Sequence, residues 1–275
     1  MGHLSMQSLA WGSSEIDWCE ANYKITSSVA EFWNTISNAL FFIIPPVLVY
    51  LFRPYARRIS RGVNVVWALL VVVGLGSVYF HSTLSLMGQL LDEIAIIWVF
   101  MAALGLWYPK RYMPAIFHRS RQWFQAFMLS LSLFTSCLAL ISPAINSIVL
   151  FILGIPATTL LVLELKRCGS QRVYNMGVRC GFMWLVALSS WISDRLFCHF
   201  WEMIHFPYMH CFWHILIFLA SSHCCILFAY FDAKEEVPDA NPRLRFWPCD
   251  DYDLCGIPYI SFHPLEPSKL EQKIY

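Results

Sequence analysis

The sequence has very little charge for its length. Of its 275 residues, 13% are Asp, Glu, Lys or Arg, whereas 58% are hydrophobic. An average soluble domain carries about a quarter charged residues. Because so few charged side chains cannot cover a globule of this size, we expect much of the surface to face lipid. The net charge of +1, with no basic stripe outside short loops, argues against a nucleic-acid partner.

Two further patterns are missing. Residues 1–31 lack the continuous apolar stretch of a cleavable signal peptide and contain four acidic residues, so we expect the first hydrophobic segment to act as its own insertion signal. The ten cysteines do not form a CxxC zinc pattern. We also find no internal repeat and no low-complexity tract.

Hydrophobic segments of about 20 residues, the length that spans a bilayer, recur along the chain. They cover residues 33–52, 63–80, 89–108, 123–142, 146–165, 180–199 and 210–231. The sequence therefore predicts an all-α membrane protein, a seven-transmembrane helix bundle over residues 33–231. Residues 1–32 precede the bundle, and residues 232–275 are expected to form a polar tail.

The basic residues predict how this bundle is oriented. In a seven-span arrangement, all Lys and Arg residues except Lys24 and Arg195 fall on one side of the membrane. Basic loops remain in the cytosol. We therefore expect a luminal N-terminal segment and a cytosolic C-terminus.

Most ionisable residues inside the predicted spans lie near their luminal ends. They are His81, Asp92, Glu93, Asp194, His210 and His214. Charges in a bilayer are costly unless they are paired, hydrated or bound to metal. This shared depth brings histidines and acids from several helices together.

Three of these residues suit a zinc ion. His210 and His214 are four residues apart, so their rings project from one face of a helix, and His81 adds a third nitrogen from another span. Three protein ligands leave a position for water, which is the arrangement of catalytic zinc. The alternative is that the histidines only hydrogen-bond between helices.

Ser77 and Asp92 are candidate catalytic residues beside this zinc site. Ser77 lies one turn before His81 and could donate to an oxyanion, or it could bond back to its own helix. Asp92 could take a proton from zinc-bound water as a general base. It could instead orient a histidine ligand.

The N-terminal segment is a second polar cluster. Asp17, Glu20, Asn22 and Glu31 offer hard oxygen ligands of the kind that calcium prefers, although a plain acidic luminal segment would look the same. Cys19 and Cys198 both fall on the luminal side, where disulfides persist.

Several blocks of this sequence, in the same order, resemble alkaline ceramidases, most closely types 1 and 2. The blocks are SSEIDWCE at 13–20, AEFWNT at 30–35, GSVYFHSTLS at 76–85, QLLDE at 89–93, WISDR at 191–195 and HCFWH at 210–214. The resemblance covers nearly the whole chain up to residue 248.

The resemblance implies a seven-span zinc hydrolase of the endoplasmic reticulum or Golgi that cleaves the amide bond of ceramide into sphingosine and a fatty acid. It implies that His81, His210 and His214 hold Zn²⁺ and that Ser77 and Asp92 assist catalysis. It also implies a Cys19–Cys198 disulfide. The implied Ca²⁺ ligands are Asp17, the backbone carbonyl of Trp18, Glu20, Asn22 and Glu31.

Two other functions would use the same residues. A non-catalytic seven-helix lipid-binding receptor would hold the zinc as a structural ion, closed by a fourth protein ligand. A proton-relay transporter would use Asp92 and Asp194. The sequence lacks the paired broken helices typical of such transporters.

Overall fold

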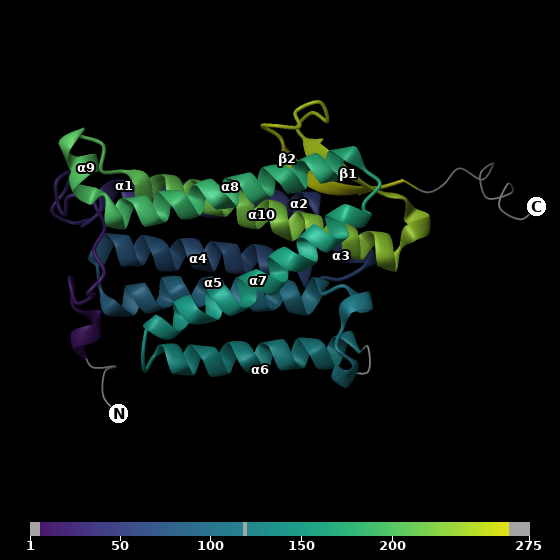
Figure 1. The fold of residues 1–275 in the computed structure, drawn as a ribbon, viewed down its shortest axis with the longest axis horizontal. Helices are drawn as coiled ribbons and strands as arrows, with labels where there is room; N and C mark the ends of the chain where they lie inside the picture. Colours follow the sequence, from purple (N-terminus) through teal and green to yellow (C-terminus); the bar gives the residue numbers. More distant parts are fainter. Residues whose placement is uncertain (1–5, 118–119, 264–275) are drawn as a thin grey trace, which may run out of the picture.

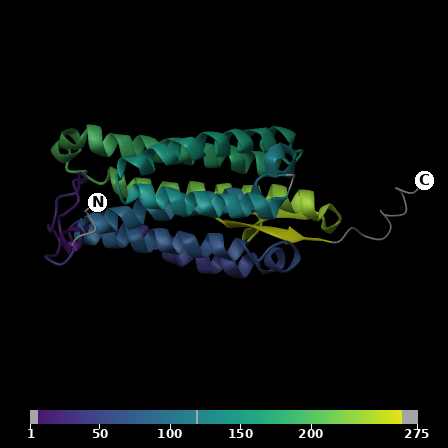
Figure 2. The ribbon, with the colours of Figure 1, turned by 90° about the horizontal axis from the view of Figure 1, so that it is seen from below.

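The computed structural model describes residues 6–117 and 120–263, which form a bundle of long helices aligned along one axis (Figures 1 and 2). The long helices are α4 (Val63–Thr83), α5 (Leu86–Trp107), α6 (Arg121–Ala139), α7 (Ala144–Arg167), α8 (Gln171–Leu196) and α10 (Met209–Glu236). The first span is assembled from α1 (Phe32–Ile36), the 3-10 helix η2 (Ser37–Ala39) and α2 (Leu40–Leu51). Shorter helices are η1 (Met6–Leu9), α3 (Arg53–Arg58), η3 (Lys110–Tyr112), η4 (Ala115–Phe117), α9 (Cys198–Met203) and η5 (Pro238–Ala240).

Six of these segments in the described residues are long and apolar enough to cross a membrane. They are Phe32–Leu51, α4, α5, α7, α8 and α10, each of which overlaps a predicted span. The structure therefore supports a mostly helical, multi-pass membrane protein. The predicted span 123–142 corresponds to α6, which lies beside α5 and α7 but is not among these six segments. Polar side chains such as Gln122 and Gln125 lower its hydropathy, so the seventh span stays a prediction.

Close packing of α4 against α5 forms one half of the bundle, and α8 against α10 forms the other. A methyl group at Gly76 of α4 would lie 2.9 Å from the backbone nitrogen of Asp92 on α5, and one at Gly88 of α5 would lie 2.8 Å from Cα of Phe80. Helices in lipid associate through such small residues, because the surrounding hydrocarbon provides no hydrophobic drive between them. Glycine at these two positions lets the α4 and α5 backbones touch.

A buried polar network ties four helices together at the end of the bundle near the C-terminus. The carboxylate of Asp232 on α10 accepts hydrogen bonds from Tyr55 at 2.5 Å and from Arg121 at 2.9 Å. Trp107 donates its indole N–H to the Tyr55 oxygen at 3.0 Å. Because removing one partner of a buried ion pair is strongly destabilising, this network fixes α3, α5, α6 and α10 against one another.

The region after residue 231 is not only a polar tail, and the protein is not entirely α-helical. Helix α10 continues to Glu236, and strands β1 (Pro242–Trp247) and β2 (Ile257–Phe262) then pair antiparallel. Side chains alternate along β1, so that Leu244 and Phe246 are buried in the core. Alternate residues of a strand face opposite sides, which explains how a charged segment contributes to the core. Residues 264–275 of the expected tail lie outside the described residues.

Salt bridges fasten this strand pair to α8. Arg172 contacts Asp250 at 3.0 Å and Asp253 at 2.6 Å, and its guanidinium lies over the Phe246 ring. Burial alone would raise the pKa of the Asp250 carboxyl, but hydrogen bonds from Arg172 and the Phe246 N–H, together with the charges of Arg172 and Arg245, hold it below its ordinary value. The strands therefore belong to the folded body of the protein.

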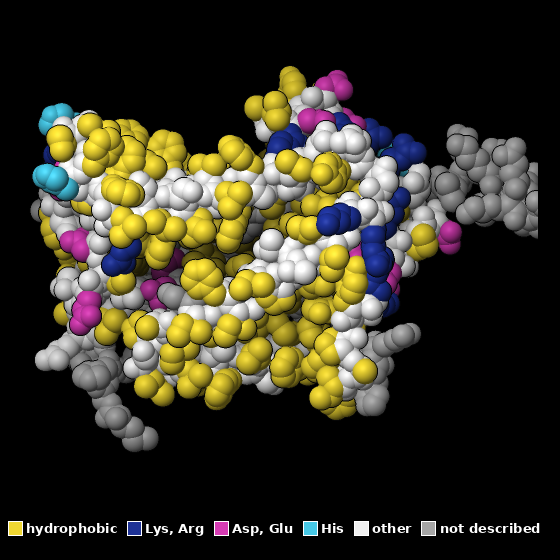
Figure 3. Space-filling model, viewed as in Figure 1, with side chains coloured by type: hydrophobic (Ala, Val, Ile, Leu, Met, Phe, Trp, Pro, Cys, Tyr) yellow, Lys and Arg dark blue, Asp and Glu magenta, His cyan; other side chains and the backbone are white. Residues whose placement is uncertain are grey.

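The two ends of the bundle differ in charge. The N-terminal segment and α9 cover one end, and the strand pair lies toward the other (Figure 1). Lys and Arg side chains gather at the second end (Figure 3). The separation agrees with the charge pattern expected from the sequence.

Candidate functional site

The three predicted zinc ligands converge at the end of the bundle covered by the N-terminal segment. His81 lies near the end of α4, and His210 and His214 lie on the first two turns of α10. One ring nitrogen from each residue lies within 4.8 Å of the others, and all three side chains are buried. Their side chains are the one group of potential metal ligands that converges in this way within residues 6–117 and 120–263.

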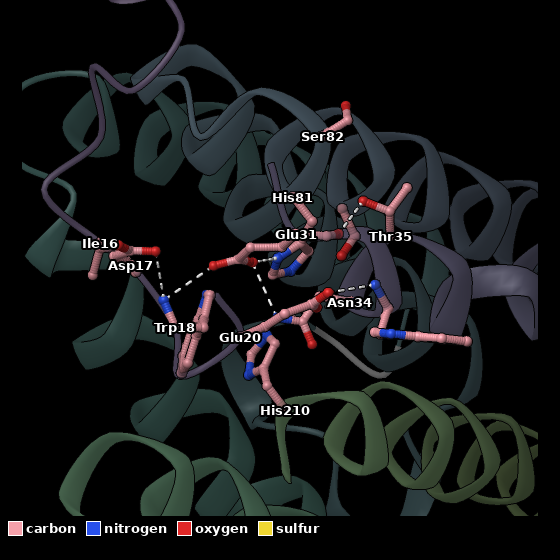
Figure 4. A network of polar contacts seen from close by, with 12 residues as sticks. Ile16, Asp17, Trp18, Glu20, Glu31, Asn34, Thr35, His81, Ser82 and His210 are labelled. Atoms are coloured by element: carbon pink, nitrogen blue, oxygen red, sulfur yellow. Dashed lines mark hydrogen bonds and ion pairs between the residues drawn. The ribbon is translucent and has the colours of Figure 1, made fainter. Parts of the chain in front are cut away.

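Each histidine is held by a partner on another segment. Nδ1 of His81 lies 2.5 Å from Oε2 of Glu31, and Nδ1 of His214 lies 2.7 Å from the Ser37 hydroxyl (Figure 4 shows the first contact). The His210 ring stacks on Trp18 with the ring centroids 3.6 Å apart. Such partners fix the ring orientation and tautomer of a metal-binding histidine.

Unpartnered nitrogens show that the cluster fits a metal ion. Nε2 of His81 and Nδ1 of His210 are buried and make no hydrogen bond in the described structure. A buried polar atom without a partner is costly. A bound metal ion would take the place of the hydrogen-bond partners that these ring nitrogens lack. Three neutral nitrogens at one point are the donor set of catalytic zinc.

The predicted catalytic residues lie beside this cluster. Oγ of Ser77 lies 3.5 Å from Nε2 of His214, and the Ser77 hydroxyl lies close enough to the Asp92 carboxyl group to interact with it. The two residues lie on α4 and α5, where Gly76 brings the helices into backbone contact. The structure thus places Ser77 between Asp92 and the histidines.

The fourth ligand that a closed structural zinc site requires is missing from the described residues. Besides the three histidines, no His, Cys, Asp or Glu joins the group. Cys211 is the nearest such residue in sequence, and its sulfur contacts Oδ1 of Asn34 at 3.1 Å. The arrangement therefore matches the open, three-ligand geometry.

The acidic N-terminal residues form a chain of contacts rather than a single converging group. Asn22 donates its amide to both carboxylate oxygens of Asp17, at 3.1 and 3.0 Å. The backbone N–H of Trp18 lies 3.1 Å from both Asp17 and Glu31 (Figure 4). Trp18 is expected to contribute its carbonyl to calcium, but these contacts use its N–H.

Glu20 and Glu31 are both buried in this segment. Glu20 accepts hydrogen bonds from the N–H groups of Trp33 and Asn34, at 2.7 and 2.8 Å, and so caps the start of α1. Burial raises the pKa of Glu20, and these backbone hydrogen bonds lower it in part.

Burial also raises the pKa of Glu31, to about 8, although hydrogen bonds from Asn34 and the Trp18 N–H lower it and the charge of Asp17 raises it. No Lys or Arg forms a salt bridge with Asp17, Glu20 or Glu31 in the described parts of the chain. Neighbouring carboxylates without a cationic side chain are the setting in which a divalent cation binds.

A disulfide and one aspartate attach the N-terminal segment to the bundle. Cys19 and Cys198 form the disulfide that the resemblance implies. The Asp194 carboxylate accepts from the backbone N–H of Cys19 at 3.0 Å and from that of His210 at 3.1 Å. Asp194 therefore fixes the segment to the start of α10, close to a candidate zinc ligand.

Two residues of the site have roles that the sequence does not predict. The sequence assigns Glu31 to calcium only and does not single out Ser37. Beside Asp194, which holds the start of α10, the guanidinium carbon of Arg195 lies over the Trp18 ring, 5.3 Å from its centroid.

Known proteins resemble this chain over most of its length. The profile of the Ceramidase family matches residues 10–261. The chain is 48% identical to an alkaline ceramidase of Drosophila melanogaster over 94% of this chain and 93% of that protein. It is 38% identical to alkaline ceramidase 1 of Homo sapiens, over 91% of this chain and 95% of the human protein.

A more distant relative matches over a similar length. An alkaline ceramidase of Caenorhabditis elegans is 32% identical over 89% of this chain and 92% of its own. Because the matches run from the N-terminal acidic segment through the histidine-bearing helices to the strand pair, the chain belongs to the ceramidase family.

Proposed function

We propose that this protein is an alkaline ceramidase that hydrolyses the amide bond of ceramide to give sphingosine and a free fatty acid. The observation that carries the proposal is the convergence of three buried imidazoles beside the neighbouring side chains of Ser77 and Asp92. Family membership and the names of the relatives support the choice of ceramide as the substrate.

The proposed metal is zinc, held by His81, His210 and His214. When bound, zinc would lower the pKa of a water molecule toward neutrality and polarise the amide carbonyl. Glu31 and Ser37 would keep Nδ1 of His81 and His214 engaged, which leaves the opposite ring nitrogens free for the metal.

Residues of this chain carry out the proton transfers and stabilise the negative charge on the carbonyl oxygen. Asp92 takes up a proton from the attacking water as its oxygen bonds to the amide carbon. Ser77 donates its hydroxyl proton in a hydrogen bond to the carbonyl oxygen as negative charge develops there. Asp92 then returns the proton to the amide nitrogen as the carbon–nitrogen bond breaks. The products are a fatty acid and the free amine of sphingosine.

We further propose that Ca²⁺ binds the N-terminal segment at Asp17, Trp18, Glu20, Asn22 and Glu31. The absence of a Lys or Arg salt bridge to Asp17, Glu20 or Glu31 among the described residues supports this. Binding would order the segment that carries Glu31 and Cys19 against the bundle. The Trp18 carbonyl and the Asn22 side chain would have to reorient toward the ion from the contacts described above.

The proposed setting is the membrane of the endoplasmic reticulum or Golgi, crossed by seven helices that include α6. The N-terminal segment would be luminal and the strand pair cytosolic. The gathering of Lys and Arg at the strand-pair end supports this orientation, and the disulfide at the opposite end agrees with an oxidising lumen.

The decisive experiment uses the purified full-length protein and a panel of ceramides of different acyl length. Mass spectrometry would measure sphingosine release with and without a zinc chelator and with and without added calcium. We expect release from at least one ceramide, its loss on chelation, and its return with zinc. Turnover that is unchanged after the zinc has been removed contradicts the proposed chemistry.

A matched pair of variants separates the metal site from general damage to the fold. His81→Ala should lose zinc and ceramide hydrolysis while remaining folded, because His81 is a ligand. His223→Ala, on the same helix as two ligands but bonded only to the Leu219 carbonyl among the contacts described, should keep both. Stoichiometric zinc with no turnover of any ceramide would instead favour the lipid-binding receptor.

A further inference from the structure

A second buried polar cluster lies next to Asp92 and has no role in the chemistry above. Glu93, the following residue on α5, accepts a hydrogen bond from the Gln89 amide at 2.9 Å and from the Asn146 amide of α7 at 2.7 Å. Gln89 in turn accepts from the Ser14 hydroxyl at 2.9 Å. The cluster therefore joins three separate segments within one turn of the candidate active site.

One hydrogen-bond acceptor of the cluster lacks a donor. Asn146 is 1% exposed, and its Oδ1 is buried and makes no hydrogen bond in the described structure. The amide nitrogen of the same side chain donates to Glu93. No Lys, Arg or His forms a salt bridge with Glu93 among the described residues, so its carboxylate has no cationic partner there. Because Oδ1 of Asn146 is an acceptor, its missing partner is a donor.

The position of the cluster matches the substrate of the proposed reaction. The carboxyl groups of Asp92 and Glu93 are close enough to interact electrostatically, and both side chains are partly exposed. Figure 3 shows acidic side chains inside a hollow between α7 and α8 at this end of the bundle. In ceramide, hydroxyl groups on carbons 1 and 3 flank the carbon that bears the amide nitrogen, so a hydroxyl donor accompanies the scissile bond.

We propose that Glu93 and Asn146 form a subsite that accepts hydrogen bonds from a hydroxyl group of the sphingoid base. The inference rests on the proposed ceramidase function and adds the determinant that recognises the headgroup. A site built to bond a hydroxyl disfavours the analogue without it, because its buried acceptors are left unpaired. The subsite selects hydroxylated sphingoid bases, whatever the acyl chain.

The test compares ceramide with its 1-deoxy and 3-deoxy analogues on the wild-type protein and on Asn146→Leu and Glu93→Gln. For the wild type, we expect kcat/KM to fall by at least about tenfold for one of the two analogues. In Asn146→Leu, the ratio of kcat/KM for ceramide to kcat/KM for that analogue should fall toward one. The value of kcat/KM for the analogue itself should stay near that of the wild type. Glu93→Gln, which replaces a carboxylate oxygen by an amide donor, should reduce the same ratio.

A variant at the outer end of the network provides the control. Ser14→Ala removes the hydrogen bond to Gln89 but neither acceptor, and should keep the wild-type ratio. Equal losses on ceramide and analogue in both subsite variants would show a purely structural role and overturn the proposal. So would a wild-type protein that hydrolyses all three substrates equally, a result that leaves ceramidase activity intact. A wild-type protein that hydrolyses no ceramide would refute the proposed function itself.

Discussion

Glu31 connects the two candidate metal sites through one carboxylate. One of its oxygens lies 2.5 Å from Nδ1 of His81, and the other accepts from the Trp18 N–H at 3.1 Å. It therefore contacts a candidate zinc ligand directly while standing in the acidic segment proposed for calcium. A carboxylate behind a histidine ligand orients the ring and raises its basicity.

Replacing Glu31 by glutamine should weaken zinc binding without unfolding the protein. The two side chains are similar in size, but the Glu31→Gln change replaces the carboxyl group beside His81 by an amide. We expect zinc affinity and ceramide turnover to fall by about 10- to 100-fold. Competition with a fluorescent zinc chelator would measure the affinity. The control is Glu15→Gln, at an exposed position of the same segment; equal zinc affinities for the two variants would contradict the role of Glu31.

The histidines of the site are predictable from sequence, whereas their partners are not. The spacing of His210 and His214 within one helix is enough to indicate a shared face. Glu31 lies 50 residues from His81, and Ser37 lies 177 residues from His214. Which side chain meets a ring across such a separation depends on helix packing, and sequence spacing carries no information about that.

At the scale of secondary-structure elements, the contact between α4 and α5 sets the position of Ser77 relative to Asp92. Gly76 faces the Asp92 backbone so closely that any side chain requires the helices to separate. Ser77 follows directly on α4. A shift of one helix therefore moves one proposed catalytic residue away from the other.

Gly76→Ala should reduce turnover more than it reduces stability. The added methyl group would lie 2.9 to 3.0 Å from backbone atoms of Leu91 and Asp92, which cannot move as a side chain can. We expect kcat to fall by about 100-fold, the usual cost of a displacement of about 1 Å, with zinc still bound. Steady-state kinetics and zinc content would measure the two effects.

Gly154→Ala is the matched control, because nothing lies within 4 Å of a methyl group at that position on α7. Alanine is the better helix former by about 1 kcal/mol, so this variant should keep full activity. Wild-type turnover by Gly76→Ala would show that the α4–α5 contact does not position the proposed catalytic residues Ser77 and Asp92.

The strand pair shows why a short element is difficult to predict from the sequence. The alternation in Pro242–Trp247 is present in the sequence, but two Arg residues and a Pro give the segment the composition of a tail. Its stability comes from α8, through Arg172, and from the core contacts of Phe246. The long helices can be predicted without knowledge of their tertiary contacts, because the length of each hydrophobic segment is sufficient.

The Cys19–Cys198 disulfide should matter to the N-terminal segment more than to the helices. A reducing agent should lower both the thermal midpoint and the turnover of the wild type, at a cost of about 2–4 kcal/mol in the free energy of unfolding. Cys19→Ser, Cys198→Ser and the double variant should all share this lower stability, because one bond is lost in each. Additive losses in the double variant would argue against a shared bond. Cys137→Ser, at an exposed free cysteine, serves as the control.

At the scale of the whole molecule, the number of spans decides where the two ends lie. The described residues contain six segments of sufficient hydropathy, and six crossings would leave both ends on one side. Seven crossings require α6, whose polar residues lower its hydropathy although it packs beside α5 and α7. The basic residues provide a further criterion, since only an odd count separates nearly all Lys and Arg from the N-terminal segment.

Cysteine labelling in sealed microsomes would distinguish six spans from seven. Cys249 and Cys255 are exposed in the loop between β1 and β2, and Ser28→Cys would add a thiol at an exposed position of the N-terminal segment. With seven spans, a membrane-impermeant maleimide should label the strand loop in intact vesicles and the N-terminal thiol only after permeabilisation. Labelling of both in intact vesicles would place both ends in the cytosol and remove α6 from the count. Because thiols on one chain share the same vesicle, labelling of the strand loop reports the orientation of the vesicles in which the N-terminal thiol is tested.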